Sequence, residues 1–194
     1  MTGMDIQSVL MVAALIAVPV ALIVFIVRRR LARTLDARLR RACPQILHDF
    51  LLPDGNEGEI HFEYAVLTPG GIWVIDTKDV EGNVFGSDTM DEWTVIHDNQ
   101  RFTFNNPQGG LLDRCAAVKA IATEVPVEGF IAFTDRARFS KGQPDSVIFF
   151  DTLIDRIAEL MPEPSAAIKD DYVAGWNTVV AQATVKGVGQ ALVK

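Results

Sequence analysis

A carboxylate and an ammonium group stand two residues apart at the end of an apolar stretch. Residues 70–79 read GGIWVIDTKD, and the apolar and aromatic run from Ile72 to Ile75 is typical of a β-strand covered on both faces. Side chains two residues apart in a strand point to the same face, so we expect Asp76 and Lys78 to project together. Such a pair can serve a catalytic site or form a salt bridge.

The residues before this stretch predict a partner strand. Residues 59–67, EIHFEYAVL, have a strand pattern, and residues 68–71, TPGG, are a turn signal. A hairpin in which Leu67 pairs with Ile72 satisfies both signals. The face near the turn is then apolar, and the open end of the hairpin is charged.

The register of this hairpin gathers acidic residues at its open end. It sets Glu63 opposite Asp76 and His61 opposite Lys78, and directly opposed Cβ atoms lie about 4.5 to 5.5 Å apart. Facing carboxylates destabilise a sheet unless a cation separates them, and the functional candidate is a divalent metal with oxygen ligands. Glu59, on the same predicted face as Glu63, is a weaker candidate ligand. The structural alternative is a salt bridge of Asp76 with Lys78 in which Glu63 is a third member.

The acid on the first strand, the turn and the VIDTK ending of the second strand resemble the nuclease-related domain (NERD) family. The similarity continues through Gly82, the region of Trp93 and the Asn-Pro pair at 106–107, and it covers residues 45–135. The resemblance implies a restriction-endonuclease-like α/β fold, with a mixed sheet flanked by helices and an acid…acid-x-Lys metal site.

The resemblance also implies a chemistry for these residues. Glu63 and Asp76 would hold Mg²⁺ or Mn²⁺, and Lys78 would orient a water molecule or offset charge on the phosphate. The implied reaction is metal-dependent hydrolysis of phosphodiester bonds in DNA or RNA. His61 is a further auxiliary candidate.

The sequence departs from the family pattern at several positions, among them Glu63 in place of the usual Asp of the first strand and Tyr64 in place of the His after it. The family usually supplies another carboxylate from a Gly-Glu pair on the helix before the first strand, whereas the helix-compatible stretch 31–50, interrupted at Pro44, contains no glutamate. Gly110 stands where family members tend to carry glutamine. Gln108 and Arg114, on a predicted helix over 107–123, either approach the site or are solvated.

An apolar run near the N-terminus predicts one transmembrane helix. Ile6 to Val27 contains no charged residue, and 22 residues at 1.5 Å per residue suffice to cross a hydrocarbon layer of about 30 Å. No basic region precedes the run, which favours an uncleaved anchor over a signal peptide. The predicted parts are an external N-terminus (1–5), the anchor (6–27), an arginine-rich juxtamembrane helix (28–44) and a nuclease-related domain (45–194).

Seven arginines follow the anchor, between Arg28 and Arg41. By the positive-inside rule they keep this end in the cytoplasm, so the protein is predicted to be a single-pass protein of the cell membrane with a cytoplasmic domain. Anionic lipid headgroups are the expected partners of this cluster, and nucleic acid is the alternative.

The rest of the chain is acidic. Beyond residue 41, 11 lysines and arginines face 23 acidic residues, a net charge of −12. This part of the chain lacks the excess of positive charge that is typical of a DNA-binding domain. The charge and the missing helix glutamate favour an alternative function, in which a catalytically degenerate nuclease fold acts as a membrane-tethered module that binds protein or nucleic acid.

The remaining pattern predicts a mixed sheet of five to seven strands with the hairpin 59–78 at its centre. Further strands are predicted at 83–86, 93–96, 102–104, 127–133 and 147–150, and further helices at 152–160 and 167–185. Cys43 and Cys115 show neither a disulfide nor a metal-binding spacing, as expected in a reducing compartment.

Overall fold

The computed structural model describes residues 35–55, 58–161 and 168–185. The chain divides into two compact units, Met1–Arg41 and Ala42–Lys194. The described part of the first unit is helical, and within it Arg40 Nε donates a hydrogen bond to Asp36 Oδ2 at 2.8 Å, one turn away.

The predicted membrane anchor, Ile6 to Val27, lies outside the described residues. Within the described part of the chain, no helix has the length and apolar character needed to cross a bilayer.

The second unit is built around a six-stranded mixed sheet in the order β10-β1-β2-β3-β7-β9. Its strands are β1 (Ile46–Pro53), β2 (Glu59–Thr68), β3 (Gly71–Lys78), β7 (Val127–Phe133), β9 (Val147–Phe149) and β10 (Thr184–Val185). The pairs β10–β1, β1–β2 and β2–β3 are antiparallel, whereas β3–β7 and β7–β9 are parallel. The predicted mixed sheet with a central hairpin is therefore confirmed, but the strands predicted at 83–86, 93–96 and 102–104 lie in a separate sheet.

The β2–β3 hairpin has the predicted register. Leu67 pairs with Ile72, and Thr68 pairs with Gly71 across the turn. Gly71 has a φ of 126°, and a Cβ atom there would lie 2.2 Å from the Pro126 carbonyl oxygen, so only glycine fits. The tight turn fixes the register of the ladder, which runs from this pair to Tyr64 and Ile75.

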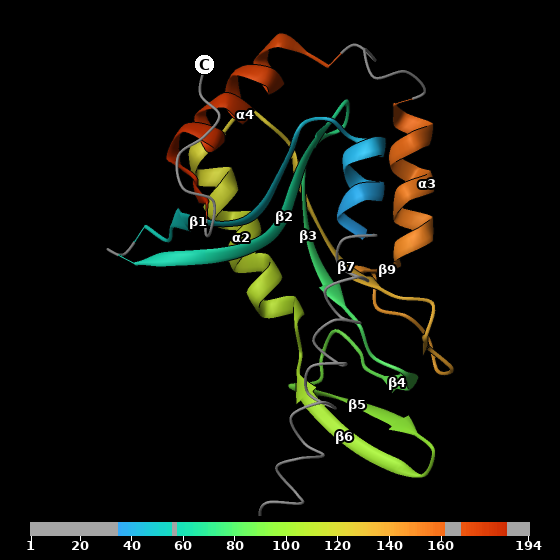
Figure 1. Cartoon of the computed structure of the whole chain (residues 1–194). Helices are drawn as coiled ribbons and strands as arrows, with labels where there is room; N and C mark the ends of the chain where they lie inside the picture. The colour runs from blue at the N-terminus through green and yellow to red at the C-terminus, as the bar shows by residue number, and fades with distance from the viewer. Residues whose placement is uncertain (1–34, 56–57, 162–167, 186–194) are drawn as a thin grey trace, which may run out of the picture. The chain divides into compact units, whose positions relative to one another are not determined.

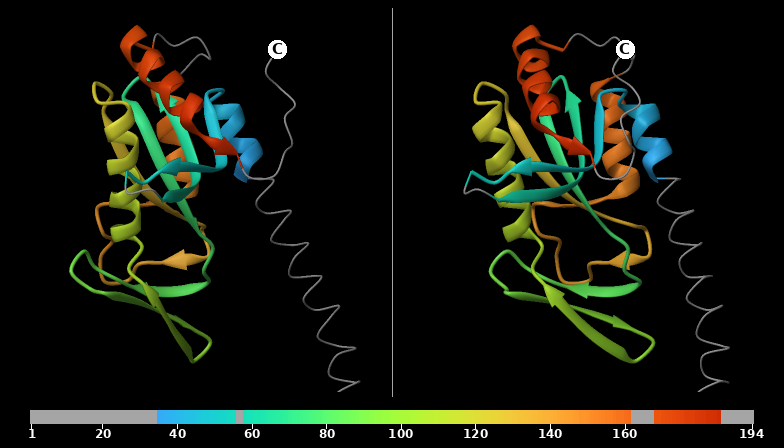
Figure 2. Two further views of the ribbon diagram at one scale, coloured as in Figure 1. Left: turned by 90° about the vertical axis from the view of Figure 1, so that its left-hand side faces the viewer. Right: turned by 60° about the vertical axis from the view of Figure 1, so that its left-hand side comes forward.

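Helices cover both faces of this sheet. Figure 1 shows α2 (Gln108–Ile121) and α4 (Asp170–Gln182) on one side and α3 (Phe150–Leu160) on the other, and Figure 2 shows the same layers from two further directions. Apolar residues of α2 and α4 share one core with the hairpin, and these are Leu111, Val118, Trp176 and Val179 against Ala65, Leu67, Ile72 and Val74. On the opposite face the Arg156 guanidinium of α3 lies over the rings of Trp73 and Phe130.

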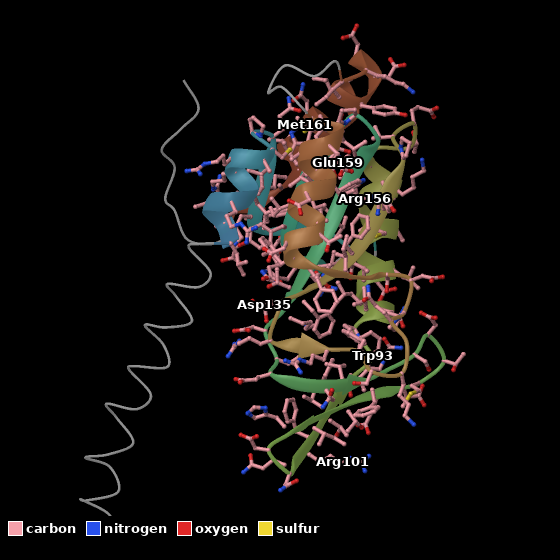
Figure 3. The ribbon with its side chains drawn as sticks, turned by 90° about the vertical axis from the view of Figure 1, so that its right-hand side faces the viewer. Trp93, Arg101, Asp135, Arg156, Glu159 and Met161 are labelled. Carbon is pink, nitrogen blue, oxygen red and sulfur yellow. The ribbon has the colours of Figure 1, made fainter. Side chains whose placement is uncertain are left out.

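A second, four-stranded sheet has the order β6-β5-β4-β8. Its strands are β4 (Gly82–Phe85), β5 (Glu92–His97), β6 (Gln100–Asn105) and β8 (Ala137–Arg138). Trp93 of β5, labelled in Figure 3, is fully buried where the sheets meet, with its ring against Phe104 of β6, Phe133 of β7 and Phe139. The prediction that Trp93 is a core residue is confirmed.

Two predicted helices are wrong in part. Residues 46–50, expected to be helical, form the start of β1, because the helix over 35–42 ends before Pro44 and the chain then pairs with β2. Residues 184–185, expected at the end of the last helix, form β10 on the edge of the sheet beside β1. In both places pairing with a neighbouring strand overrides a helix-compatible pattern.

Candidate functional site

The candidate site lies where β2 and β3 separate. Their ladder ends with the pair Tyr64 and Ile75, and the same register carried one step further sets Glu63 opposite Asp76. Beyond that point the first half of β2 pairs with β1, and the end of β3 pairs with β7. Figure 1 shows β2 bending away from β3 at this place. The polar side chains of the hairpin line the resulting fork.

β1 adds a third acid at the same level of the sheet. The β1–β2 ladder pairs His48 with Tyr64 and Phe50 with Phe62, so Asp49 falls opposite Glu63. Asp49 has a φ of 51°, an uncommon value for a residue with a side chain, and it interrupts the ladder. Its Oδ1 atom lies 2.7 Å from His61 Nε2. By register Asp49, Glu63 and Asp76 therefore occupy corresponding positions on β1, β2 and β3, although neither Asp49 with Glu63 nor Glu63 with Asp76 is a ladder pair.

Asp76 is the buried member of this row. The residue is 7% exposed, and its Oδ2 atom accepts a hydrogen bond from Arg114 Nη1 at 3.0 Å. Burial raises the pKa of the Asp76 carboxyl, and the opposing charges of Arg114, Lys78 and His61 do not cancel this effect. Desolvation therefore outweighs the ion pair with Arg114 in its effect on the charge of this carboxyl.

Glu63 is held by the neighbouring residue of β3. The Thr77 N–H donates to Glu63 Oε2 at 2.7 Å, and the Thr77 hydroxyl donates to Glu63 Oε1. Two hydrogen bonds to a carboxylate fix its orientation. Glu63 and Asp76 therefore have separate partners, Thr77 for the first and Arg114 for the second.

Helix α2 brings Arg114 to the fork because it packs closely on β7. A Cβ atom at Gly129 of β7 would lie 2.7 Å from Cys115 Sγ and 2.9 Å from Leu111 Cγ, so glycine is what allows this approach. Burial, helped by the charge of Asp76, raises the pKa of the Cys115 thiol to about 11. Cys115 is therefore an unreactive packing residue beside the site.

The other predicted site residues lie in different surroundings. The Lys78 ammonium makes no hydrogen bond or ion pair within the described residues, and its charge acts on the Asp76 carboxyl. Gln108 does not approach the fork, because its side-chain amide donates to Asp88 Oδ1 and Ser146 Oγ at 2.5 and 2.9 Å.

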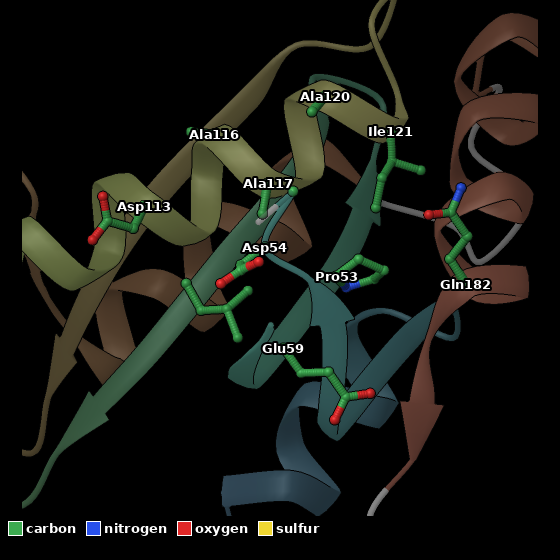
Figure 4. A pocket seen from close by; sticks show the side chains of 11 residues that line it. Pro53, Asp54, Glu59, Asp113, Ala116, Ala117, Ala120, Ile121 and Gln182 are labelled. Carbon is green, nitrogen blue, oxygen red and sulfur yellow. The ribbon is translucent and has the colours of Figure 1, made fainter. Parts of the chain in front are cut away.

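Glu59 also lies away from Asp76. Figure 4 shows it at the rim of a pocket between the end of the β1–β2 hairpin and α2, together with Asp54 and Asp113. Among the described residues, no lysine, arginine or histidine lines this pocket. Glu59 therefore belongs to a separate acidic surface.

The end of β3 is fixed by a second group of charges. Thr134 Oγ1 donates to Asp79 Oδ1 at 3.0 Å, and the Arg136 guanidinium pairs with Asp79 and with Glu81. The hydrogen bond that Arg136 donates to Asp79 raises the pKa of Arg136. This network joins the loop after β7 to the residue that follows Lys78, and it positions the strand end that carries the lysine.

The donor set restricts which metal the fork can hold. Within the described residues no three His, Cys, Asp or Glu side chains converge closely enough to bind a metal ion. Asp76 Oδ1 nevertheless has no hydrogen-bond partner among those residues, while Oδ2 is taken by Arg114. Mg²⁺ is usually held by one or two carboxylates, with waters and substrate phosphate completing its shell. The fork fits an ion of this kind and does not fit a metal that needs a cage of protein ligands.

The family model described as nuclease-related domain matches residues 25–134, more than half of the chain. The chain belongs to the nuclease-related domain (NERD) family. The matched region contains the whole fork, from Asp49 through Asp76 to Arg114, and it extends into the arginine-rich segment before β1. No curated protein and no solved structure matches the chain.

Sequence reasoning missed two residues of this site and left the place of a third open. Asp49 was expected in a helix, and only its position in β1 aligns it with Glu63 and Asp76. Thr77 was not predicted as a site residue, yet it binds Glu63 through both its N–H and its hydroxyl. The sequence left open whether Arg114 approaches the site or is solvated, and in the structure Arg114 contacts Asp76. Assigning residues 46–53 to a strand instead of the end of a helix would have placed Asp49 beside Glu63.

Proposed function

We propose that this NERD protein is a membrane-anchored nuclease that hydrolyses phosphodiester bonds of DNA or RNA with the help of Mg²⁺ or Mn²⁺. The observation that carries the proposal is Asp76, a buried carboxylate with one open oxygen, on the strand that also carries Lys78. Burying a carboxylate against its raised pKa costs stability, and such costs are concentrated at functional sites.

The residues of the fork have distinct roles in this proposal. Asp76 and Glu63 would hold the ion, which when bound polarises the scissile phosphate and acidifies a water molecule. Lys78 offsets the negative charge that develops on the phosphate, or orients the attacking water by hydrogen bonding. His61, paired with Asp49, adds a second donor on the β2 side of the fork.

The proposal includes a location and a second partner. The apolar run Ile6 to Val27 anchors the chain in the cell membrane, and the arginines between Arg28 and Arg41 contact anionic lipid headgroups and keep the domain in the cytoplasm. A reporter fused after Lys194 is expected to be active in the cytoplasm. Activity of that fusion on the outer side of the membrane would refute this orientation.

A second candidate function is a catalytically degenerate module that binds protein or nucleic acid. It is favoured by one observation: each acid of the fork already has a donor within the chain. His61 contacts Asp49, Thr77 holds Glu63 and Arg114 pairs with Asp76. A fold whose carboxylates are all matched internally has less need of a metal ion.

The deciding experiment is cleavage of plasmid DNA, single-stranded DNA and RNA by the full-length chain, with Mg²⁺, with Mn²⁺ and with EDTA. The nuclease proposal predicts metal-dependent cleavage that Asp76→Ala abolishes. Asp145→Ala is the matched control, because Asp145 is an exposed acid far along the chain from the fork residues. Absence of cleavage, or equal cleavage by Asp76→Ala, refutes the assignment, and binding without cleavage supports the second candidate.

A further inference from the structure

Arg114 is the cation that joins the two sides of the fork. Its Nε atom donates to the His61 carbonyl oxygen of β2 at 2.6 Å, and its Nη1 atom donates to Asp76 Oδ2 of β3 at 3.0 Å. The side chains of Arg114 and Asp76 are 23% and 10% exposed. A single guanidinium therefore satisfies a carbonyl and a carboxylate at the point where the strands stop pairing.

The start of α2 leaves room for this guanidinium. A Cβ atom at Gly110 would lie 3.0 Å from Arg114 Nη1, closer than most real Cβ contacts. Gly110 is one turn before Arg114, so any side chain there presses on the end of the arginine that holds Asp76. Glycine at this position costs helix stability relative to alanine, and the space it leaves is filled by the Arg114 guanidinium.

We propose that Arg114 is the resident counterion of Asp76 and competes with a divalent ion for this carboxylate, so that metal binds tightly only when a phosphate draws the guanidinium away. The inference rests on the proposed function, because it assumes that Asp76 is a metal ligand. A positive charge in contact with a carboxylate repels a second cation from it. A guanidinium binds phosphate oxygens through two parallel hydrogen bonds, so a phosphodiester is a suitable competitor for Arg114.

The proposal predicts how variants respond to metal alone. Thermal unfolding of the full-length chain is followed at increasing Mn²⁺ concentrations, with no nucleic acid present. Arg114→Met is expected to reach half of its maximal stabilisation at a Mn²⁺ concentration at least about tenfold lower than the parent. Arg138→Met is the control, because Arg138 is an exposed arginine of the second sheet, and it is expected to respond as the parent does.

Phosphate and metal are expected to bind cooperatively in the parent. A phosphorothioate-linked tetrathymidylate, which resists hydrolysis, is expected to lower the Mn²⁺ concentration for half-maximal stabilisation of the parent. The oligonucleotide has a much smaller effect on Arg114→Met, because the arginine that couples the two ligands is absent. Equal coupling in both proteins would overturn the proposal.

Gly110→Gln provides a test that keeps the arginine. Glutamine favours the helix and displaces the guanidinium from Asp76, so tighter Mn²⁺ binding than in the parent is expected even if Arg114→Met does not fold. Equal Mn²⁺ responses of the parent, Gly110→Gln and any folded Arg114→Met overturn this inference alone and leave the metal site standing. Absence of any Mn²⁺ response in every variant overturns both this inference and the proposed metal-dependent function.

Discussion

Replacing Asp76 by asparagine separates the cost of burying a charge from the benefit of an ion pair. The substitution keeps the shape of the side chain and an oxygen that can accept the hydrogen bond from Arg114, and it removes the negative charge. If the ion pair dominates, breaking a buried pair costs about 3 to 5 kcal/mol of unfolding free energy. If desolvation dominates, removal of the charge lowers the cost of burying this side chain and so favours the folded state.

The raised pKa of Asp76 favours the second outcome. Burial raises this pKa although Arg114, Lys78 and His61 all act to lower it, so the ionised carboxylate is less favourable in the folded than in the unfolded chain. Exchange of a charged for a neutral acceptor costs about 1 kcal/mol, and the relief of desolvation offsets this cost. We therefore expect the unfolding free energy of Asp76→Asn at pH 7 to lie within about 1 kcal/mol of the parent value.

The raised pKa of Asp76 also determines how the unfolding free energy depends on pH. An acid whose pKa is raised by folding contributes stability that is complete below its unfolded pKa of about 3.9 and is lost as the pH rises through the folded value. The parent is therefore expected to lose stability relative to Asp76→Asn as the pH rises from about 4 to neutrality. Urea unfolding in EDTA, followed by tryptophan fluorescence from pH 4.5 to 8, measures this difference.

Asp145→Asn is the matched control, since it removes an exposed carboxylate from the same unit and is expected to show no such pH-dependent difference. A loss of 3 kcal/mol or more in Asp76→Asn at pH 7, together with a difference from the parent that does not vary with pH, would refute the reasoning. Asp76 would then be a structural partner of Arg114, and the metal site would lose its main support.

Three further predictions concern the surroundings of Asp76. Thr77→Val removes the hydroxyl bond to Glu63 and is expected to lower the unfolding free energy by about 1.5 to 3 kcal/mol, measured by urea titration, with a smaller loss if water replaces the bond. Cys43 and Cys115 have pKa values raised to about 11, so both thiols should react with iodoacetamide at pH 8 far more slowly in the folded than in the urea-unfolded chain, and equal rates would contradict the burial argument. Gly129→Ala is expected to destabilise the fold by about 1 to 3 kcal/mol because the new methyl group meets Cys115 and Leu111, and an unchanged melting temperature would show that α2 can move away from β7.

The hairpin could be predicted from the sequence because its signals are local. The turn at 68–71 fixes the register, and the apolar run up to Ile75 requires cover on both faces, so the alignment of Glu63 with Asp76 follows by counting. The central place of the hairpin in a mixed sheet followed from the strands and helices after it. The second sheet was predicted only as separate strands, since nothing local specifies which strands share a ladder.

The rest of the site depends on contacts between distant parts of the chain. Residues 46–50 have helical spacing, but β1 forms because it can pair with β2 on one side and with β10, more than 130 residues later, on the other. Arg114 is 38 residues from Asp76, and its direction depends on how closely α2 approaches Gly129. Sequence spacing does not encode such a packing distance. The sequence therefore predicts that Arg114 lies on a helix, but it does not predict that Arg114 contacts the Asp76 carboxylate.

Each acid at the fork has one donor residue within the chain: His61 for Asp49, Thr77 for Glu63 and Arg114 for Asp76. Whether the fork binds a metal ion depends on how easily these three contacts are displaced. Thr77 holds Glu63 through neutral donors, and the contact of His61 with Asp49 is exposed to solvent, so neither contact is a buried ion pair that a metal ion must displace. The Arg114 contact is the one that is charged and mostly buried. Because a phosphodiester attracts a guanidinium and brings oxygen ligands for a metal, substrate can open this contact and complete the ion's shell together. A protein partner without phosphate lacks both properties, so release of Arg114 by a phosphodiester would distinguish a site that recognises nucleic acid from one that binds only protein.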